Sequence, residues 1–246
     1  MRIAEEVYLI ASGALGTGDT HACDCNVYAV RCGSEYALID SGVGIASNQL
    51  ATNLKADGIS EHSLRRLLLT HKHLDHSGGA RWFRDSFGLE VYGSAQTAAA
   101  LESGDEEAIS LAAAKRAGIY SQDTEFRACK VDRRIAHGET WVLGDTTIQA
   151  ISTPGHSEDM LSYVVQKPGR TLLFSGDAVF HGGRVLISDV YDCDVPAYGR
   201  SLRTLAKISI DALYPGHGMW TVRGGGAHLA KAVEYLDKLL LPPNLI

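Results

Sequence analysis

The segment HKHLDH at residues 71–76 places three histidines and one aspartate one residue after a run of three leucines, with Thr70 between them. An apolar strand that ends in such a cluster delivers several metal ligands to one point, and neutral imidazole with carboxylate suits zinc, iron or manganese. Because alternate residues of an extended segment project to the same side, His71 and His73 can share one ion. Asp75 and His76 turn elsewhere and can hold a second. The simpler alternative is a polar surface cluster at a strand end, since short metal motifs also arise by chance.

Three further residues of ligand type lie on turns that contain glycine, each just after an apolar, strand-like run. They are His156 in TPGHS (153–157), Asp177 in SGD (175–177) and His217 in PGHG (215–218). This repeated placement is difficult to attribute to chance. It favours a metal site built from four separate segments of the chain.

The composition is that of an ordinary globular protein, 45% hydrophobic and 21% charged. At 246 residues the chain is longer than a typical domain, but α/β folds of this size often form one domain. The net charge of −6 argues against a nucleic-acid partner, because domains that bind phosphate backbones usually carry a basic surface. We therefore expect a small-molecule substrate.

Features of targeting segments and disulfide frameworks are missing. No stretch approaches the roughly 18 apolar residues that a membrane span needs. The start of the chain, MRIAEE, carries acidic residues where a signal peptide needs an apolar segment. The five cysteines are odd in number and lack disulfide-framework spacing. These features predict a cytoplasmic protein with no membrane partner, whose cysteines are structural thiols.

Hydrophobic periodicity and turn residues predict a mixed α/β protein. Helices are expected from about 44 to 58, after residue 77, at 195–208 and at 227–241. Strands are expected at 7–11, 26–30, 36–39, 64–69, 141–143, 146–151, 161–165 and 171–174. We predict a single domain over 1–246 with an alanine-rich helical insert at about 94–130. Such an insert can roof an active site as a lid, and an exposed apolar face on it would favour a homodimer.

In order and spacing, the motifs resemble those of the metallo-β-lactamase-fold superfamily. The matching pieces are HKHLDH, TPGHS, SGD and PGHG, together with a strand that ends LIDSG at 38–42. The resemblance covers about residues 7–218 and implies a four-layer αββα sandwich of two similar halves. It also implies that the protein is a metal-dependent hydrolase.

Carried over residue by residue, the resemblance assigns His71, His73 and His156 to one ion. Asp75, His76 and His217 would bind a second, and Asp177 would bridge the two. Two divalent ions are expected, Zn²⁺ first, with Fe or Mn as alternatives. Metal-bound hydroxide would attack the carbonyl carbon of a lactone, ester or thioester, with Asp75 steering it and moving its proton. Asp40 is a candidate partner behind a ligand histidine, with a turn or helix cap as its alternative role.

The bridging aspartate resembles the glyoxalase II, lactonase and related esterase branches more than true β-lactamases. Only 29 residues follow His217, so the helical substrate domain of glyoxalase II proteins is expected to be missing. Many quorum-signal lactonases place a tyrosine three residues after the bridging aspartate. Phe180 occupies that position here, which places acyl-homoserine-lactone hydrolysis in doubt.

Other chemistries remain open at this point. Persulfide dioxygenases of the same fold use one iron, with ligands that correspond to His71, His156 and Asp177. Phosphodiester cleavage and a non-enzymatic metal-binding role are further alternatives. Three residues of one loop are candidates for substrate contact, namely His181, Arg184 and Tyr191.

Overall fold

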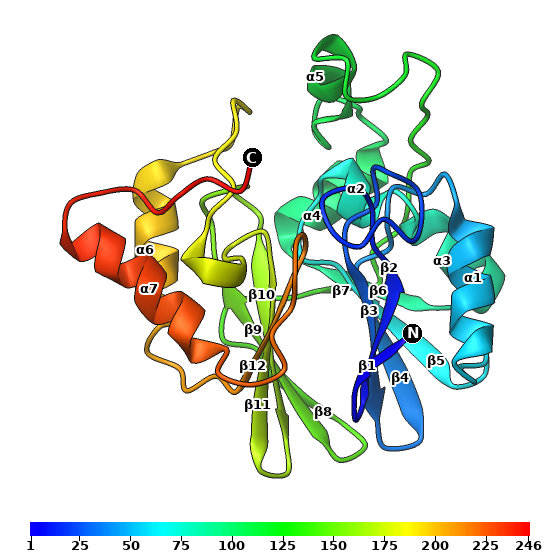
Figure 1. Ribbon diagram of the computed structural model, residues 1–246. Helices are drawn as coiled ribbons and strands as arrows, with labels where there is room; N and C mark the ends of the chain where they lie inside the picture. The colour runs from blue at the N-terminus through cyan, green and yellow to red at the C-terminus, as the bar shows by residue number, and fades with distance from the viewer. The chain divides into compact units, whose positions relative to one another are not determined.

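The computed structural model describes residues 1–246, and the chain separates into two compact units, Met1–Ile135 and Ala136–Ile246. Each unit contains one β-sheet together with helices that connect or follow its strands (Figure 1). The prediction of a mixed α/β fold is confirmed. One sheet and one set of helices in each unit also agree with the two similar halves that the resemblance implies.

Unit 1 is organised around a seven-stranded sheet with the order β1-β2-β3-β4-β5-β6-β7. Strands β1 to β4 pair antiparallel, whereas β4 to β7 pair parallel. Parallel neighbours need long crossover connections, and helices occupy those connections here. The strands are β1 (Arg2–Ala4), β2 (Val7–Ala11), β3 (Val27–Cys32), β4 (Glu35–Ile39), β5 (Leu64–Leu68), β6 (Glu90–Gly93) and β7 (Arg133–Arg134).

The helices of unit 1 bury one stripe of apolar side chains against the sheet. Helices α1 (Ser47–Ala56) and α3 (Ala80–Phe87) lie along one face of the sheet (Figure 1). Leu50 and Leu54 of α1 and Phe83 of α3 are buried in one cluster with strand leucines. The short helix α2 (Leu74–Ser77) carries Asp75 and His76, so it belongs to both the fold and the candidate site.

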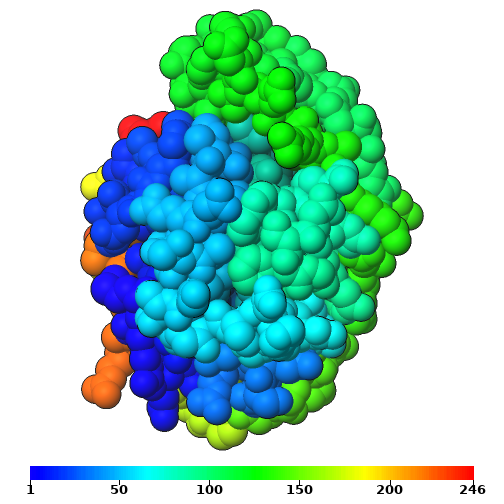
Figure 2. All heavy atoms as spheres, turned by 90° about the vertical axis from the view of Figure 1, so that its right-hand side faces the viewer, coloured from blue at the N-terminus to red at the C-terminus, as the bar shows by residue number.

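The predicted insert at 94–130 contains two helices and a long irregular segment. They are α4 (Ala95–Ser103) and α5 (Leu111–Arg116), and most of the chain from 117 to 132 has no regular structure. Ser94 begins α4 by accepting a hydrogen bond from the Thr97 amide. In the space-filling view the segment around α5 rises above the rest of unit 1 (Figure 2).

Unit 2 is organised around a five-stranded sheet with the order β12-β11-β10-β9-β8. Strands β8 to β11 pair antiparallel, and β11 pairs parallel with β12. Figure 1 shows the two long helices of this unit along one face of its sheet. The elements are β8 (Thr140–Leu143), β9 (Thr146–Ser152), β10 (Leu161–Lys167), β11 (Arg170–Gly176), the 3₁₀ turn η1 (His181–Gly183), α6 (Val195–Leu205), β12 (Ala212–Pro215) and α7 (Gly226–Asp237).

The ends of the last two helices differ from the prediction. Helix α6 ends at Leu205 and α7 at Asp237, three and four residues before the predicted ends. The apolar residues Leu239, Leu240 and Leu241 after α7 are exposed, so no buried face extends the helix. Across the chain, none of the helices combines the length and apolar character that a membrane crossing requires.

Candidate metal centre

The ligand-type residues of unit 1 follow from the direction of its strands. Because β4 and β5 are parallel, their carboxyl ends lie at the same edge of the sheet. Asp40 comes directly after β4, and Thr70 and His71 follow the end of β5. Ligands of open α/β sheets bind outside the carboxyl ends of strands. Two segments 30 residues apart in sequence are thereby brought into hydrogen-bond contact.

The three histidines of HKHLDH form one compact, buried group. His71 and His76 are fully buried, and their ring centroids lie 4.1 Å apart. The ring of His73 lies 4.7 Å from that of His71. Asp75 is the most accessible member, with its side chain 22% exposed and its Oδ2 3.5 Å from His76 Nε2. The group therefore combines buried imidazoles with one carboxylate that solvent reaches.

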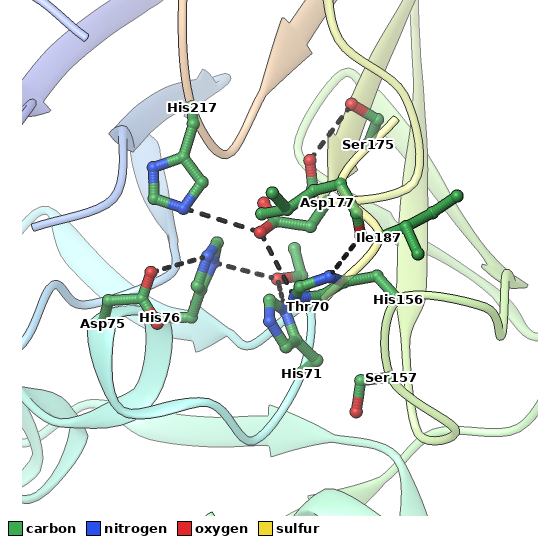
Figure 3. Close-up of polar contacts among 12 residues, drawn as sticks. Thr70, His71, Asp75, His76, His156, Ser157, Ser175, Asp177, Ile187 and His217 are labelled. Atoms are coloured by element: carbon green, nitrogen blue, oxygen red, sulfur yellow. Dashed lines mark hydrogen bonds and ion pairs between the residues drawn. The ribbon is translucent and has the colours of Figure 1, made fainter. Parts of the chain in front are cut away.

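A hydrogen-bond network behind these rings sets which nitrogen each presents. Asp40 Oδ2 accepts from His76 Nδ1 at 2.8 Å and from the Thr70 hydroxyl at 2.9 Å. Thr70 Oγ1 lies 3.0 Å from His71 Nδ1, and it accepts that proton because its own goes to Asp40. With the Nδ1 protons held by these oxygens, the Nε2 atoms would be the nitrogens that bind a metal, as is usual when a carboxylate backs a metal histidine. Figure 3 shows Thr70 between the two rings.

Gly78, directly after α2, allows a close approach to the segment that follows β4. A Cβ atom on Gly78 would lie 2.2 Å from the carbonyl oxygen of Val43. Ser41 also fixes this contact between α2 and the segment after β4, because its amide and its hydroxyl both donate to the His76 carbonyl. The SGG sequence after His76 therefore serves close packing, which keeps His76 within reach of Asp40.

Two further residues, Cys25 and Tyr120, lie near this group. The sequence motifs did not indicate that either would. Cys25 is fully buried, and burial raises the pKa of its thiol to about 12 despite the neighbouring His76. This thiol therefore stays protonated. Tyr120, from the insert, packs against the unit 1 core. Burial, followed by the charge of Asp75, raises its pKa well above the usual value. The insert thus brings a protonated phenol within electrostatic range of Asp75.

Replacing Asp40 with Asn tests the network. Asp40 has a φ of +61°, which Asn also tolerates, so the backbone should be retained. We expect Zn²⁺ affinity to fall by about 10–100-fold, the usual effect of losing such a partner. Competition with a chromogenic chelator measures the change. The matched control is Asp132→Asn, which removes a carboxylate paired with Arg84 in the same unit. Equal affinity in wild type and Asp40→Asn would show that Asp40 does not orient His76.

The ligand-type residues of unit 2 also gather at one sheet edge. Strand β9 is antiparallel to β10, and β10 is antiparallel to β11, so β9 and β11 run in the same direction. Strand β12 is parallel to β11. His156, Asp177 and His217 follow the carboxyl ends of these three strands. Three segments spread over 62 positions therefore meet because of strand direction.

Asp177 lies between the two histidines of unit 2 (Figure 3). Its Oδ2 is 3.5 Å from Nε2 of His156 and 3.5 Å from Nε2 of His217. All three side chains are buried. One carboxylate oxygen facing two imidazole nitrogens is the arrangement that a bridging metal ligand needs.

The ring of His156 is oriented by a backbone carbonyl. Its Nδ1 donates to the Leu186 carbonyl oxygen at 2.8 Å, so its Nε2 is the nitrogen that faces Asp177. Tyr198 of α6 supports both partners: its hydroxyl donates to the Asp177 carbonyl and accepts from the Leu186 amide. Sequence reasoning missed Tyr198, because nothing in the surrounding residues marks it.

Phe180 forms an apolar wall beside His217. It is fully buried, and its ring centroid lies 6.3 Å from that of His217.

The predicted substrate contacts lie on the loop that follows Phe180. The His181 ring lies 4.6 Å from that of His228, Arg184 donates to the Asn244 carbonyl, and Tyr191 is 67% exposed. A role for these three residues in substrate contact stays a prediction.

The donor set suits a borderline divalent ion. Both units offer buried imidazoles whose Nδ1 atoms are held by protein groups, together with carboxylates at contact distance. Imidazole nitrogen with carboxylate oxygen is the ligand chemistry of zinc, iron and manganese, whereas magnesium and calcium prefer oxygen alone. The residues therefore fit a transition-metal or zinc centre.

Comparison with known proteins identifies relatives over most of the chain. A family model described as the metallo-β-lactamase superfamily matches residues 21–217, and this superfamily is hydrolytic. An atrochrysone carboxyl ACP thioesterase of Aspergillus fumigatus is 31% identical over 196 residues, covering 78% of this chain and 50% of that protein. Thioesterase pkgB of Emericella nidulans is 29% identical over 195 residues, covering 78% and 45%. The chain thus spans about half the length of these relatives.

Solved structures share the fold. A metallo-β-lactamase of Cronobacter sakazakii superposes with a TM-score of 0.73 at 19% identity, covering 97% of this chain and 96% of that one. BJP-1, a subclass B3 metallo-β-lactamase of Bradyrhizobium japonicum, gives a TM-score of 0.72 at 23% identity, covering 97% and 91%. At this level of identity the similarity concerns the fold alone.

Proposed function

Because this chain belongs to the metallo-β-lactamase superfamily, we propose that it is a metal-dependent hydrolase that cleaves an acyl thioester or a related ester or lactone. The observation that carries the proposal is the pair of buried ligand groups at the carboxyl ends of strands. In each group a protein oxygen accepts a hydrogen bond from a histidine Nδ1, Asp40 from His76 and the Leu186 carbonyl from His156. The Nε2 atom of each ring therefore points away from that oxygen. Metal-ligating histidines almost always donate their other ring N–H to a carboxylate or a backbone carbonyl, as His76 and His156 do here.

We propose two ions, with the ligands that the superfamily resemblance assigns. His71, His73 and His156 would hold one ion, and Asp177 would serve both. The second would be held by Asp75, His76 and His217. The need for Asp177 follows from electrostatics, since two dications about 3.5–4 Å apart repel strongly unless an anionic ligand is shared.

When bound, the ions would supply an activated water at neutral pH and polarise the carbonyl of the substrate. The protein residues then have three tasks. Asp75, partly exposed beside His76, would accept and pass on the proton of the attacking water. Asp40 and the Leu186 carbonyl would hold the ligand rings in place. Phe180 would exclude water beside His217, because it is apolar and fully buried.

A thioester is the first substrate class to examine. The curated relatives named above are thioesterases, and one of those names specifies an ACP thioester. Phe180 cannot donate a hydrogen bond, so a lactone carbonyl would lack the tyrosine that many lactonases use. We therefore place an acyl thioester of a small molecule, free or carried on a carrier protein, ahead of a lactone.

Metal analysis joined to a substrate panel tests the proposal. Protein purified without added metal would be examined by elemental analysis, then assayed on an acyl thioester, a lactone, an ester and a phosphodiester. We expect two divalent ions per chain and thioester cleavage that is lost with chelator and returns with Zn²⁺. One iron per chain, with oxygen uptake on a persulfide and no hydrolysis, would replace the proposal with sulfur oxidation. Faster phosphodiester cleavage would replace the acyl substrate with a phosphoryl one.

A further inference from the structure

The buried hydroxyl of Tyr198 joins two segments that carry ligand-type residues in unit 2. It donates to the backbone carbonyl of Asp177 and accepts from the amide of Leu186 at 3.2 Å. The Leu186 carbonyl in turn accepts from His156 Nδ1 at 2.8 Å. One side chain therefore contacts the backbone of Asp177 and that of Leu186, the residue whose carbonyl accepts from His156.

The surroundings of Tyr198 suit this task. The side chain is almost fully buried and lies on α6, which Asp194 caps by accepting from the Ala197 amide. Helix α6 also holds the turn that carries His156, because Ser201 donates to the Pro154 carbonyl at 2.7 Å.

We propose that Tyr198 is a positioning residue of the metal centre, which sets the separation and orientation of His156 and Asp177 and thereby the affinity for the ion that His156 binds. The inference rests on the proposed function only in assuming that these residues bind metal. Tyr198 itself touches neither substrate nor ion. Its hydroxyl acts through the Asp177 carbonyl and through Leu186.

Tyr198→Phe separates positioning from packing, because it retains the ring and removes only the hydroxyl. We expect Zn²⁺ titration against a chromogenic chelator to show binding weakened by about 10–100-fold for the ion assigned to His156, as for other partners that orient metal ligands, with a smaller loss for the second ion that Asp177 shares. The matched control is Tyr163→Phe, which removes a hydroxyl from a fully buried tyrosine of β10 in the same unit. The control should keep wild-type Zn²⁺ affinity, and thermal melts would show that both variants fold.

The outcomes separate the inference from the proposed function. If wild type binds Zn²⁺ and Tyr198→Phe binds it equally well, Tyr198 is a packing residue and the inference fails. If Tyr198→Phe weakens Zn²⁺ binding but wild type cleaves nothing in the substrate panel, the inference holds and the hydrolase proposal fails. A wild-type protein that binds no Zn²⁺ would overturn both. Equal loss of affinity in Tyr198→Phe and Tyr163→Phe would also overturn the inference, since general destabilisation would then explain the effect.

Discussion

Asp177→Ala should leave at most one metal ion per chain and reduce kcat/KM by about 100- to 1,000-fold. The reason is electrostatic: without the carboxylate, two neighbouring dications would face each other with no shared anionic protein ligand. Losing one ion's polarising effect removes about 3–4 kcal/mol of transition-state stabilisation. Elemental analysis measures the ion count, and steady-state kinetics on the best thioester measures the rate.

A matched control is available on the same sheet. Asp211 lies immediately before β12 and accepts a hydrogen bond from the Thr171 amide at 2.8 Å. Asp211→Ala removes a structural carboxylate of unit 2 and should keep the wild-type ion count. Asp177→Asn is a second useful variant, because it retains the shape and loses the charge. Two ions per chain in Asp177→Ala would show that this carboxylate is not a bridging ligand.

Gly155→Ala is the second change for which we expect a large effect. Gly155 lies in the TPGHS turn with a φ of +154°, in a region that L side chains rarely adopt. A Cβ there would lie 2.5 Å from the Cα of Tyr198 and 2.6 Å from its Cγ. Either the turn that carries His156 or the α6 residue Tyr198, which contacts Leu186 beside His156, must move. We expect about 3 kcal/mol lower unfolding free energy, the upper part of the usual range for overpacking, and weaker Zn²⁺ binding.

The control for Gly155→Ala is a glycine that also has a positive φ but whose Cβ would meet no clash. Gly169, between β10 and β11, also has a positive φ (+72°), but a Cβ at that position would meet no atom within 4 Å. Gly169→Ala should lower the unfolding free energy by less than Gly155→Ala does, and it should not change metal affinity. Urea unfolding measures both variants. If the two substitutions lower the unfolding free energy equally, contact with α6 does not explain the need for glycine at 155.

Sequence reasoning located the ligand-type residues because each lies on a short motif at a strand end. His71, His156, Asp177 and His217 follow β5, β9, β11 and β12, as the hydrophobic runs predicted. Strand β6 was not predicted. It has only four residues, Glu90–Gly93, and lies between a glycine-ended helix and the start of α4, so its periodicity is too short to recognise.

The sequence also did not predict where the helices of the insert begin and end. Alanine-rich composition predicted helix through much of 94–130, but regular helix is limited to α4 and α5. Helix propensity is a weak preference that tertiary context overrides. Tyr120, in the irregular segment after α5, packs against the unit 1 core. This tertiary contact was not indicated by any local sequence pattern.

The sequence by itself determined the superfamily, the mixed α/β fold and the chemical identity of the candidate ligands, because these depend on residue types at short spacing. Only the tertiary structure decided what holds those ligands. Asp40 reaches His76 across 36 residues, and Tyr198 reaches the Asp177 carbonyl across 21. Such contacts depend on strand direction, on close approach at glycines and on burial. These are properties of the folded chain: the sequence offered Asp40 as a partner for a ligand histidine without indicating which one, and no local pattern marked Tyr198.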